Sequence, residues 1–496
     1  MTIEQLVSVL NDVEIKGDVN KDIEFVTHDS RRVRKNTLFV CICGTRVDGN
    51  KFIPQAIKAG ACAIMTEQDV QVPDDITVIK VPDIHKAIEM AVPYFYDYPG
   101  KKMRMIGVTG TNGKTSSTYM LRDILRSAGY KVGVIGTIKI MIEDEEMPIH
   151  NTTPDVIDLQ EILAMMYAKH IDYVVMEVSS HALAMNRVAG CEYDTAMFTN
   201  LTQDHLDYHK TMENYALAKA KLFDSLSADN LIKVNKTAVI NLDDALGSKT
   251  MIEHTRCNLI TYGIDSEATL KAQNVEIKAS GANFDIDYNG EKTHFALKVT
   301  GMFNVYNILG VIGVALAEKI NMAIIKRTLE DFKAVAGRFE LVREGQDFSV
   351  IVDYAHTPDG LENVLKTARE IAKKRLIVVF GCGGDRDRTK RPIMGRIAAQ
   401  LADVVIATSD NPRTEDPEFI LSEVEAGVLP ALHGNIHEKI TDRRTAIFRA
   451  IELAQTDDIV LIAGKGHENY QILKTGTIHF DDKEVAIEAI RGKING

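Results

Sequence analysis

The stretch that decides the fold spans residues 103–136 and reads MRMIGVTGTNGKTSSTYMLRDILRSAGYKVGVIG. Residues 103–108 are predominantly apolar, as in a buried strand, and a glycine-rich loop follows them. Gly129 stands where a helix end favours glycine, and residues 131–135 form another apolar run. Between them lies the apolar face of a helix, formed by Met120, Leu121, Ile124, Leu125 and Ala128. The stretch therefore predicts one strand–helix–strand unit with parallel strands.

The same alternation of short apolar runs and helical patterns continues outside this stretch, which predicts an α/β fold with parallel sheets. At the N-terminus, Ile3, Leu6, Val7 and Leu10 follow the spacing of a surface helix. Further strands are predicted at residues 173–176, 196–198, 350–352, 376–380, 404–407 and 459–462.

A length of 496 residues favours about three domains, because a single core rarely grows beyond about 250–300 residues. Residues 98–102 are rich in turn formers and precede a predicted strand. Residues 333–337 follow a helical pattern over residues 304–332. We therefore predict domains at residues 1–99, 100–333 and 334–496.

Composition excludes several classes of protein. Hydrophobic residues make up 45% and charged residues 26%, as in globular proteins. The net charge of −12 argues against binding to nucleic acid, and no apolar run approaches the length of a membrane span. The start of the chain lacks the features of a targeting signal. Six irregularly spaced cysteines favour buried free thiols in a reducing cytoplasm over a zinc site or disulfides.

Each predicted strand leads directly into a loop of small and charged residues. Ligands of open α/β sheets bind outside the carboxyl ends of the strands, so we expect these loops to form the site, with two sheets facing one cleft. The loops read GTNGKT, EVSSHAL, TNLTQDH, DYAHTPD, GCGGDRD, TSDNPR and GKGHE. GCGGDRD lacks the third glycine of a dinucleotide-binding loop, which argues against NAD.

Residues 107–115 have the context of a phosphate loop, since they join a strand to a helix. In such loops a lysine contacts the β- and γ-phosphates and the next hydroxyl residue binds Mg²⁺, roles that fall to Lys114 and Thr115. Val108 replaces the first glycine of the strict pattern. A plain glycine-rich turn is the alternative, and the loop alone fits a GTPase, a kinase or another ATPase.

Two further side chains are candidates for the same site. Glu177 follows an apolar strand, the position of a Mg²⁺-binding acid in phosphate-loop enzymes, although a solvated strand-end glutamate is the alternative. His205 lies in NLTQDHLDYH, where two histidines and two aspartates crowd one loop. Mg²⁺ prefers oxygen ligands, so a structural histidine remains an alternative.

The loops together resemble those of the Mur ligase family over residues 29–470. The matching stretches are GVTGTNGKTSST, NTTPD, MEVSSHAL, FTNLTQDHLDYH, AKAKLF, GMFNVYN, GRFE, DYAHTPD, GCGGDRD, SDNPR and GKGHENYQ. The resemblance implies a small N-terminal substrate-anchoring α/β domain, a central phosphate-loop ATPase domain and a C-terminal Rossmann-like domain. It implies a cytoplasmic ATP- and Mg²⁺-dependent ligase of peptidoglycan synthesis, a pathway needed for cell shape and division, and we expect a monomer.

The reaction that the resemblance implies has two steps. The γ-phosphoryl group of ATP moves to a substrate carboxylate, and an amine then displaces phosphate from the acyl phosphate. The implied catalytic residues are Lys114, Glu177, His205 and Lys219. Thr115 and Glu177 would bind a first Mg²⁺ and His205 a second, while Lys219 would be carbamylated and serve as a further ligand. From the residues alone, Lys219 is equally a solvent-facing lysine, and Lys221 is as good a candidate.

The resemblance also implies two further sets of contacts. Those around ATP are Gly110, Thr111, Asn112, Gly113, Lys114, Thr115, Ser116, Asn304, Asn307, Arg338, Asp353 and His356. Arg338 would reach the γ-phosphate on domain closure, and a domain-interface ion pair is its alternative. Those to UDP-N-acetylmuramoyl-L-alanyl-D-glutamate are Ser30, Asn151, Thr152, Thr153, Ser179 and Arg187. A simple turn at Ser30 and a helix cap with Pro154 at its first position are the alternatives there.

The incoming amino acid is indicated by Asp410-Asn411-Pro412-Arg413. A guanidinium can grip a carboxylate with two hydrogen bonds, and meso-diaminopimelate is lysine with an additional carboxylate at its far end. The resemblance agrees, because D-N-P-R is typical of family members that add meso-diaminopimelate. Arg386, Gly464 and Glu468 match the other contacts. Solvated loop charges, a folylpolyglutamate-type ligase, an acceptor such as L-lysine, and a catalytically silent nucleotide-binding scaffold are the alternatives.

Overall fold

The computed structural model describes residues 1–44, 47–149, 151–228, 231–278 and 280–495. The chain divides into two compact units, one formed by Met1–Tyr262 with Gly310–Ile324 and the other by Gly263–Leu309 with Ile325–Gly496. Both units contain parallel sheets with helices between the strands, so the predicted α/β class is confirmed.

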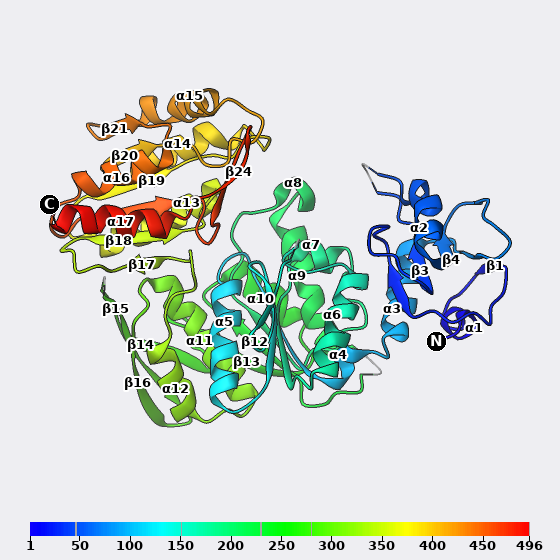
Figure 1. Ribbon diagram of the computed structural model, residues 1–496. Coiled ribbons are helices and arrows are strands. Elements are labelled where there is room, and N and C mark those ends of the chain that lie inside the picture. The colour runs from blue at the N-terminus through cyan, green and yellow to red at the C-terminus, as the bar shows by residue number, and fades with distance from the viewer. Residues whose placement is uncertain (45–46, 150, 229–230, 279, 496) are drawn as a thin grey trace. The chain divides into compact units, whose positions relative to one another are not determined.

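The first unit begins with a small sheet, shown in blue in Figure 1. Its strands, in spatial order, are β1 (Glu14–Lys16), β5 (Thr77–Lys80), β4 (Ala61–Thr66), β3 (Thr37–Val40) and β2 (Phe25–Thr27). Only β1 is antiparallel to its neighbour. The associated helices are α1 (Ile3–Val7), α2 (Ile53–Ala59) and α3 (Ile84–Phe95). The predicted N-terminal helix forms but ends at Val7, before Leu10.

The large sheet of the first unit carries the phosphate loop. Its order is β13 (Asn258–Gly263), β12 (Thr237–Asn241), β11 (Thr195–Phe198), β6 (Arg104–Thr109), β10 (Tyr173–Glu177), β7 (Val132–Ile135), β8 (Ile140–Ile142) and β9 (Glu145–Met147). Register pairs Glu177 with Val108 and Phe198 with Thr109. The carboxyl ends of β10, β6 and β11 therefore lie side by side, as the sequence predicts.

Helices pack on this sheet through apolar faces. The helices are α4 (Pro99–Lys102), α5 (Lys114–Ser127), α6 (Val156–Ala168), α7 (Ser180–Ala184), α8 (Leu206–His209), α9 (Met212–Ser227) and α10 (Ala245–Glu253). In α5 four residues of the predicted face are buried, while the fifth, Ala128, is half-buried and caps the helix end. Gly129 follows with φ +93°. The alternative that placed Pro154 at the first position of a helix is wrong. Asp155 instead caps α6 and accepts from the backbone N–H groups of Ile157 and Asp158. Pro154 thus precedes the cap.

The second unit contains three antiparallel strands that the sequence analysis did not predict. They are β14 (Leu270–Lys278), β15 (Gly281–Tyr288) and β16 (Glu291–Leu297). The helical pattern of residues 304–332, which runs through both units, forms two helices, α11 (Met302–Ala317) and α12 (Met322–Asp331). Lys319, between them, has φ +60°, which interrupts helical geometry.

The C-terminal sheet also belongs to the second unit. Its order is β17 (Glu340–Val342), β18 (Ser349–Asp353), β22 (Ile459–Ala463), β19 (Leu376–Phe380), β20 (Val404–Ala407) and β21 (Ile436–Lys439). All neighbours except β17 and β18 run parallel, so the predicted loops after β18, β22, β19 and β20 emerge at one edge. The remaining elements are α13 (Pro358–Ile371), α14 (Lys390–Leu401), α15 (Pro417–Val428), α16 (Arg443–Leu453), α17 (Asp482–Asn495) and a hairpin of β23 (Tyr470–Leu473) and β24 (Gly476–His479).

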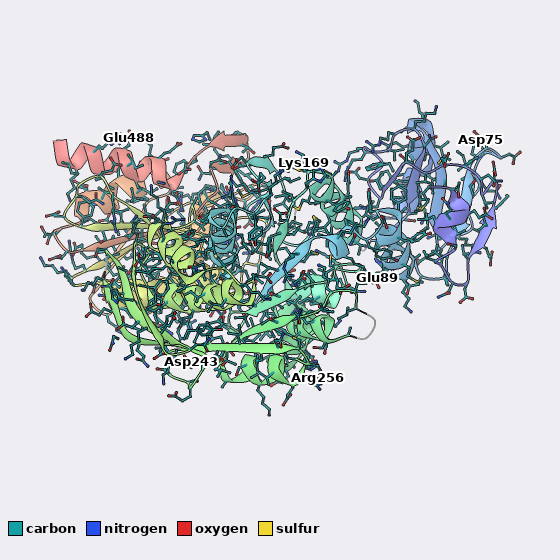
Figure 2. The ribbon with its side chains drawn as sticks, turned by 90° about the horizontal axis from the view of Figure 1, so that it is seen from below. Asp75, Glu89, Lys169, Asp243, Arg256 and Glu488 are labelled. Carbon is teal, nitrogen blue, oxygen red and sulfur yellow. The ribbon has the colours of Figure 1, made fainter. Side chains whose placement is uncertain are left out.

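Charged side chains such as Asp75, Lys169, Arg256 and Glu488 are exposed at the surface (Figure 2). Within the described residues, no helix has the length and apolar character that crossing a bilayer requires. The six cysteines are free. The expectation that all are buried is wrong, because only Cys41 and Cys382 are buried, while Cys43 is exposed.

Candidate functional site

The phosphate loop is shaped by two glycines and by its close approach to the loop after β11. Gly110 has φ +145° and Gly113 has φ +87°, conformations that favour glycine. A Cβ on Gly110 would lie 1.8 Å from the Thr199 Oγ1 atom. Asn200 braces the loop, since its backbone O accepts from Thr111 N at 2.8 Å and its Oδ1 accepts from Asn112 N at 2.9 Å.

The phosphate-binding candidates lie at the start of α5. Lys114 begins this helix, and its Nζ donates to the backbone O atoms of Gly110 at 2.9 Å and Thr111 at 2.7 Å. Thr115 is buried, whereas Ser116 is half-buried. The N-terminus of a helix of this length carries unsatisfied N–H groups and a partial positive charge, both of which attract phosphate.

Glu177 is a buried carboxylate held by the loop that follows β7. Its side chain is 1% exposed, so the solvated strand-end alternative is wrong. Thr137 N donates to Oε1 at 2.9 Å and Thr137 Oγ1 donates to Oε2 at 3.0 Å. A Cβ on Gly136 would lie 2.4 Å from Oε1. Sequence reasoning missed Thr137, because no spacing rule connects the ends of β7 and β10.

Lys219 lies beneath the phosphate loop and is only 1% exposed, so it is not a solvent-facing lysine. Its Nζ donates to Gly110 O at 2.9 Å and lies 4.3 Å from the centre of the Tyr215 ring. Burial, reinforced by the charge of Lys114, lowers the pKa of Lys219 well below its ordinary value. A neutral amine can react with CO₂, whereas an ammonium cannot.

Lys221, the other sequence candidate, is different. Its side chain is exposed, and its Nζ lies 3.4 Å from the backbone O atoms of Leu183 and Ala184.

His205 is the exposed member of a group of histidines at the end of the β11 loop. His205 directly precedes α8 and has a φ of +55°. Its Nε2 is 3.3 Å from Asp204 Oδ2. The ring centre of His181 is 4.7 Å from that of His205. The other histidine of the motif, His209, is buried and hydrogen-bonds Ser180 Oγ at 2.9 Å. Of the two, His205 is therefore the histidine that solvent and ligands can reach.

Four residues predicted to bind the UDP-linked substrate lie together near the end of β10. Thr153 Oγ1 donates to Glu177 O at 2.9 Å and accepts from Ser179 N at 3.0 Å. Arg187 Nη1 donates to Thr153 O at 3.3 Å. Thr152 Oγ1 lies 3.1 Å from Thr137 Oγ1. This cluster thus adjoins the carboxylate of Glu177.

The other two residues of this predicted set form no hydrogen bond with that cluster among the described residues. Asn151 is exposed, and Ser30 Oγ donates to Gln55 Oε1 at 3.3 Å in the small N-terminal sheet region.

The predicted nucleotide residues of the second unit form a second group. Asp353 accepts from Phe339 N at 2.7 Å and from Ala355 N at 2.8 Å. The guanidinium of Arg338 lies 5.0 Å from the Tyr354 ring centre. Burial raises the pKa of the Asp353 carboxyl, and the charge of Arg338 opposes this effect. His356 is exposed, and its Nδ1 is 2.9 Å from Tyr354 O.

The two predicted asparagines of α11 are both buried. Asn304 Nδ2 donates to Thr300 O at 2.8 Å. Asn307 Nδ2 has no hydrogen-bond partner among the described residues, which makes this amide a candidate donor to a ligand.

The predicted acceptor residues gather at the carboxyl edge of the C-terminal sheet. Asn411 Nδ2 donates to Glu468 Oε2 at 2.9 Å, and both Asp410 and Asn411 are buried. A Cβ on Gly464 would lie 3.1 Å from Asp410 Oδ2, so the loop after β22 packs directly on the loop after β20. Lys465, which is fully buried in this cluster, was not predicted.

Arg413 bridges two of the loops. Its φ is +54°, its side chain is half-buried, and its Nη1 donates to Gly384 O at 2.7 Å. A Cβ on Gly384 would lie 1.9 Å from Pro412 O. This close contact explains why a glycine stands at this position of GCGGDRD, and no bound dinucleotide is needed to explain it. Arg386 is exposed and donates only to Asp385 O at 3.0 Å within the described residues. Arg386 is therefore open to solvent, whereas Arg413 is held between two loops.

The donor set fits a magnesium ion that is bound largely through a nucleotide. In the described parts of the chain, no group of three or more His, Cys, Asp and Glu side chains is arranged to hold a metal. Mg²⁺ commonly takes one or two protein oxygens and completes its shell with phosphates and water. The Thr115 hydroxyl, at the start of α5, and the Glu177 carboxylate, in the register position next to β6, are such oxygens.

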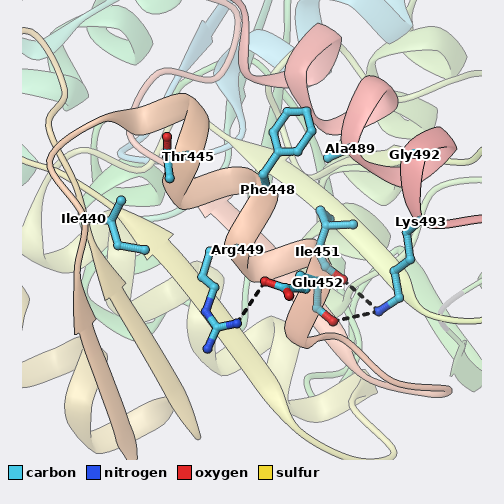
Figure 3. Close-up of a pocket in the computed structure, with 9 residues that line it drawn as sticks. All are labelled: Ile440, Thr445, Phe448, Arg449, Ile451, Glu452, Ala489, Gly492 and Lys493. Atoms are coloured by element: carbon cyan, nitrogen blue, oxygen red, sulfur yellow. Dashed lines mark hydrogen bonds and ion pairs between the residues drawn. The ribbon is translucent and has the colours of Figure 1, made fainter. Parts of the chain in front are cut away.

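A pocket beside α16 and α17 contains none of the predicted residues (Figure 3). It is mostly apolar, and the Nζ of Lys493 donates to the backbone O atoms of Ile451 at 2.9 Å and Glu452 at 3.0 Å. Its Arg449 and Glu452 side chains pair with each other at 2.9 Å.

Comparisons with known proteins agree with this arrangement. Three family descriptions match: "Mur ligase family, catalytic domain" over residues 22–96, "Mur ligase middle domain" over residues 108–315, and "Mur ligase, glutamate ligase domain" over residues 337–466. The chain therefore belongs to the Mur ligase family, as the loops predict, and is an ATP-dependent ligase that forms amide bonds.

Among its relatives is the UDP-N-acetylmuramoyl-L-alanyl-D-glutamate–2,6-diaminopimelate ligase of Clostridium botulinum, which is 48% identical over 95% of this chain and 96% of that protein. The ligase of the same name from Bacillus cereus is 46% identical over 100% and 99%. A solved structure of a ligase with this name is 33% identical and covers 100% of this chain and 99% of that one, with a TM-score of 0.70. A solved Thermotoga maritima ligase in complex with ADP shares the fold, with a TM-score of 0.64, 17% identity and coverage of 95% and 98%.

Proposed function

We propose that this chain joins meso-diaminopimelate to UDP-N-acetylmuramoyl-L-alanyl-D-glutamate and releases ADP and phosphate. The observation that carries the proposal is the placement of Arg413, held by Gly384 O, at the same sheet edge as the Asp410 and Glu468 carboxylates. Arg413 can pair with the far carboxylate of diaminopimelate, and the Asp410 and Glu468 carboxylates can pair with its far ammonium. L-lysine lacks that carboxylate and would leave Arg413 without a carboxylate to bind.

The first step is phosphoryl transfer. An oxygen of the substrate carboxylate attacks the γ-phosphorus of ATP, and the bond to the β-phosphate oxygen breaks, which gives an acyl phosphate and ADP. Lys114 and the N–H groups of residues 110–116 bind the phosphates in this proposal. Bound Mg²⁺ supplies charge neutralisation. Thr115 and Glu177 would hold one ion, and His205 and a carbamate on Lys219 would help to hold a second.

The second step is amide formation. The free amine of diaminopimelate attacks the acyl carbon, inorganic phosphate leaves, and the amine gives up its proton. Arg386, Asp410, Asn411, Pro412, Arg413, Gly464 and Glu468 position the acceptor. Asn304, Asn307, Arg338, Asp353 and His356 contribute to the nucleotide site, and exclusion of water would protect the acyl phosphate from hydrolysis.

Binding of the UDP-linked substrate is assigned to Ser30, Asn151, Thr152, Thr153, Ser179 and Arg187. Thr153 shares hydrogen bonds with Glu177 and Ser179, so this loop can bring the substrate carboxylate close to the metal-binding residues. We further propose a cytoplasmic monomer with domains at residues 1–99, 100–333 and 334–496. The six free cysteines fit a reducing compartment.

An acceptor assay tests the proposal. Phosphate release is measured with ATP, Mg²⁺ and UDP-N-acetylmuramoyl-L-alanyl-D-glutamate, without an acceptor and with meso-diaminopimelate or L-lysine, and products are weighed by mass spectrometry. We expect release and a tripeptide product only with diaminopimelate. Equal or better use of L-lysine would assign a different acceptor, and phosphate release that ignores both substrates would refute the proposed reaction.

A further inference from the structure

Lys465 is a fully buried lysine at the carboxyl edge of the C-terminal sheet. It lies between Gly464, with φ +119°, and Gly466, with φ +52°. A Cβ on Gly466 would lie 2.6 Å from Tyr354 Cβ and 2.8 Å from Gly337 O. Only glycine fits this turn without strain, and the turn fixes where the backbone of Lys465 lies.

The ammonium group of Lys465 contacts three acceptors. Its Nζ is 3.1 Å from Glu468 Oε2, 3.3 Å from Asn411 Oδ1 and 3.6 Å from Asp410 Oδ1. Burying a charge is costly unless it is paired and hydrogen-bonded. These contacts account for a lysine at a position with no exposure to solvent.

Lys465 also determines how its neighbours are oriented. Asn411 Oδ1 accepts from Lys465 Nζ and from Ile472 N at 2.9 Å, so the amide NH₂ of Asn411 must face Glu468. Asn411 Nδ2 and Lys465 Nζ then both donate to Glu468 Oε2. Two donors on one oxygen hold the Glu468 carboxylate in place, although that side chain is 17% exposed.

The Lys465 cluster has one uncompensated negative charge, which one further cation can neutralise. One ammonium, from Lys465, faces two carboxylates, those of Asp410 and Glu468. Asp410 Oδ1 is buried and has no hydrogen-bond donor among the described residues. The nearby Arg443 adds no net charge, because it is paired with the fully buried Asp482 through contacts of 2.7 and 2.6 Å.

We propose that Lys465 is a positioning residue for the acceptor amino acid. It holds Asn411 and Glu468 in the orientation that receives the acceptor's ammonium group, and it reduces the negative charge of the cluster to the single charge that one ammonium neutralises. This inference rests on the proposed function, because it requires an amino-acid acceptor at this edge of the sheet.

The test compares Lys465→Met and Lys465→Gln with the native chain in steady-state assays. Lys465→Met removes a hydrogen bond to a charged group, so we expect the KM for diaminopimelate to rise by about tenfold or more. Lys465→Gln keeps a donor but no charge, so we expect a smaller rise. The KM values for ATP and the UDP-linked substrate should stay within about twofold of native. Unchanged acceptor KM, or a uniform loss across all three substrates in a folded variant, would overturn the inference.

Lys236→Met is the matched control. Lys236 is another buried lysine beside a carboxylate, with its Nζ 3.2 Å from Glu192 Oε1, and it belongs to no proposed site. It should affect thermal unfolding but not the KM for diaminopimelate.

A crystal structure of the native chain with diaminopimelate gives an answer even if both Lys465 variants fail to fold. We expect Lys465 Nζ to remain on Glu468 Oε2 while a ligand ammonium contacts the Asp410 or Glu468 carboxylate. A Lys465 Nζ that instead binds a ligand carboxylate would contradict the positioning role. If the native chain shows no acceptor-dependent phosphate release, the proposed function fails. If the native chain is active and only the KM pattern differs, the Lys465 inference alone fails.

Discussion

Replacing Gly110 by alanine tests whether the phosphate loop depends on close contact with the β11 loop. The new Cβ would lie 1.8 Å from Thr199 Oγ1 and 3.0 Å from Asn200 N, so the two loops must move apart. Gly129→Ala is the matched control, because Gly129 also has a positive φ, +93°, but nothing lies within 4 Å of the added Cβ.

The expected magnitudes follow from these contacts. A residue held at φ +145° costs about 1–3 kcal/mol in backbone strain. Displacing Thr199 Oγ1 breaks its hydrogen bond to Asn112 O, at 2.7 Å, and costs about 1 kcal/mol more. Gly110→Ala should therefore destabilise the chain by about 2–4 kcal/mol. Gly129→Ala should cost only the strain of a left-handed residue, about 1–2 kcal/mol.

Urea unfolding followed by circular dichroism measures the stability, and ATP-dependent phosphate release measures the site. Gly110→Ala should raise the KM for ATP by about tenfold or more, because displaced N–H donors lose their contacts with phosphate. Thr199→Ala removes the clashing atom, so the double variant should be about 1 kcal/mol more stable than the two single effects predict. The reasoning is refuted if Gly110→Ala matches Gly129→Ala in stability and retains the native KM for ATP.

Two further predictions concern Lys219 and Arg413. Burial lowers the pKa of Lys219 in the folded chain, so the unfolded chain binds more protons and stability falls as pH falls below the ordinary lysine pKa. In CO₂-free buffer, Lys219→Met should therefore raise the unfolding midpoint more at about pH 7 than at about pH 9, and Lys221→Met should not. Lys219→Ala should lose activity that high bicarbonate cannot restore, and full activity would remove the proposed carbamate. Arg413→Ala should lower kcat/KM for diaminopimelate by roughly tenfold to a few hundredfold with the KM for ATP unchanged, and an equal loss with L-lysine would contradict recognition of the additional carboxylate.

Local patterns were enough to predict the parallel sheets. The strands at 376–380 and 404–407 have the predicted bounds, because a run of apolar residues closed by a glycine or a polar loop is recognisable without knowledge of its neighbours. The loops of small and charged residues that follow these strands were predictable for the same reason. The antiparallel strands β14–β16 were missed. In β14 the alternation of exposure is broken, and its register with β15 shifts between Gln273 and Glu276.

The contacts between loops were not predictable in the same way. Thr137 reaches Glu177 across 40 residues of sequence, and Lys465 reaches Asn411 across 54. Each contact depends on which strands become neighbours in the sheet and on their register, and a single sequence does not encode either in its local spacing. The resemblance supplied the residues of the family motifs, but Thr137 and Lys465 became apparent only from hydrogen bonds.

Lys219 and Lys465 show why burial alone does not define the role of a lysine. Both side chains are almost completely removed from solvent. Lys219 donates to a backbone oxygen and faces the positive charge of Lys114, so its environment favours the neutral amine that can accept CO₂. Lys465 lies between two carboxylates and an amide oxygen, and its hydrogen bonds and ion pairs hold these groups in place. The sequence presents each as a lysine beside small residues, and only the charges brought together by the fold assign one to reactivity and the other to positioning.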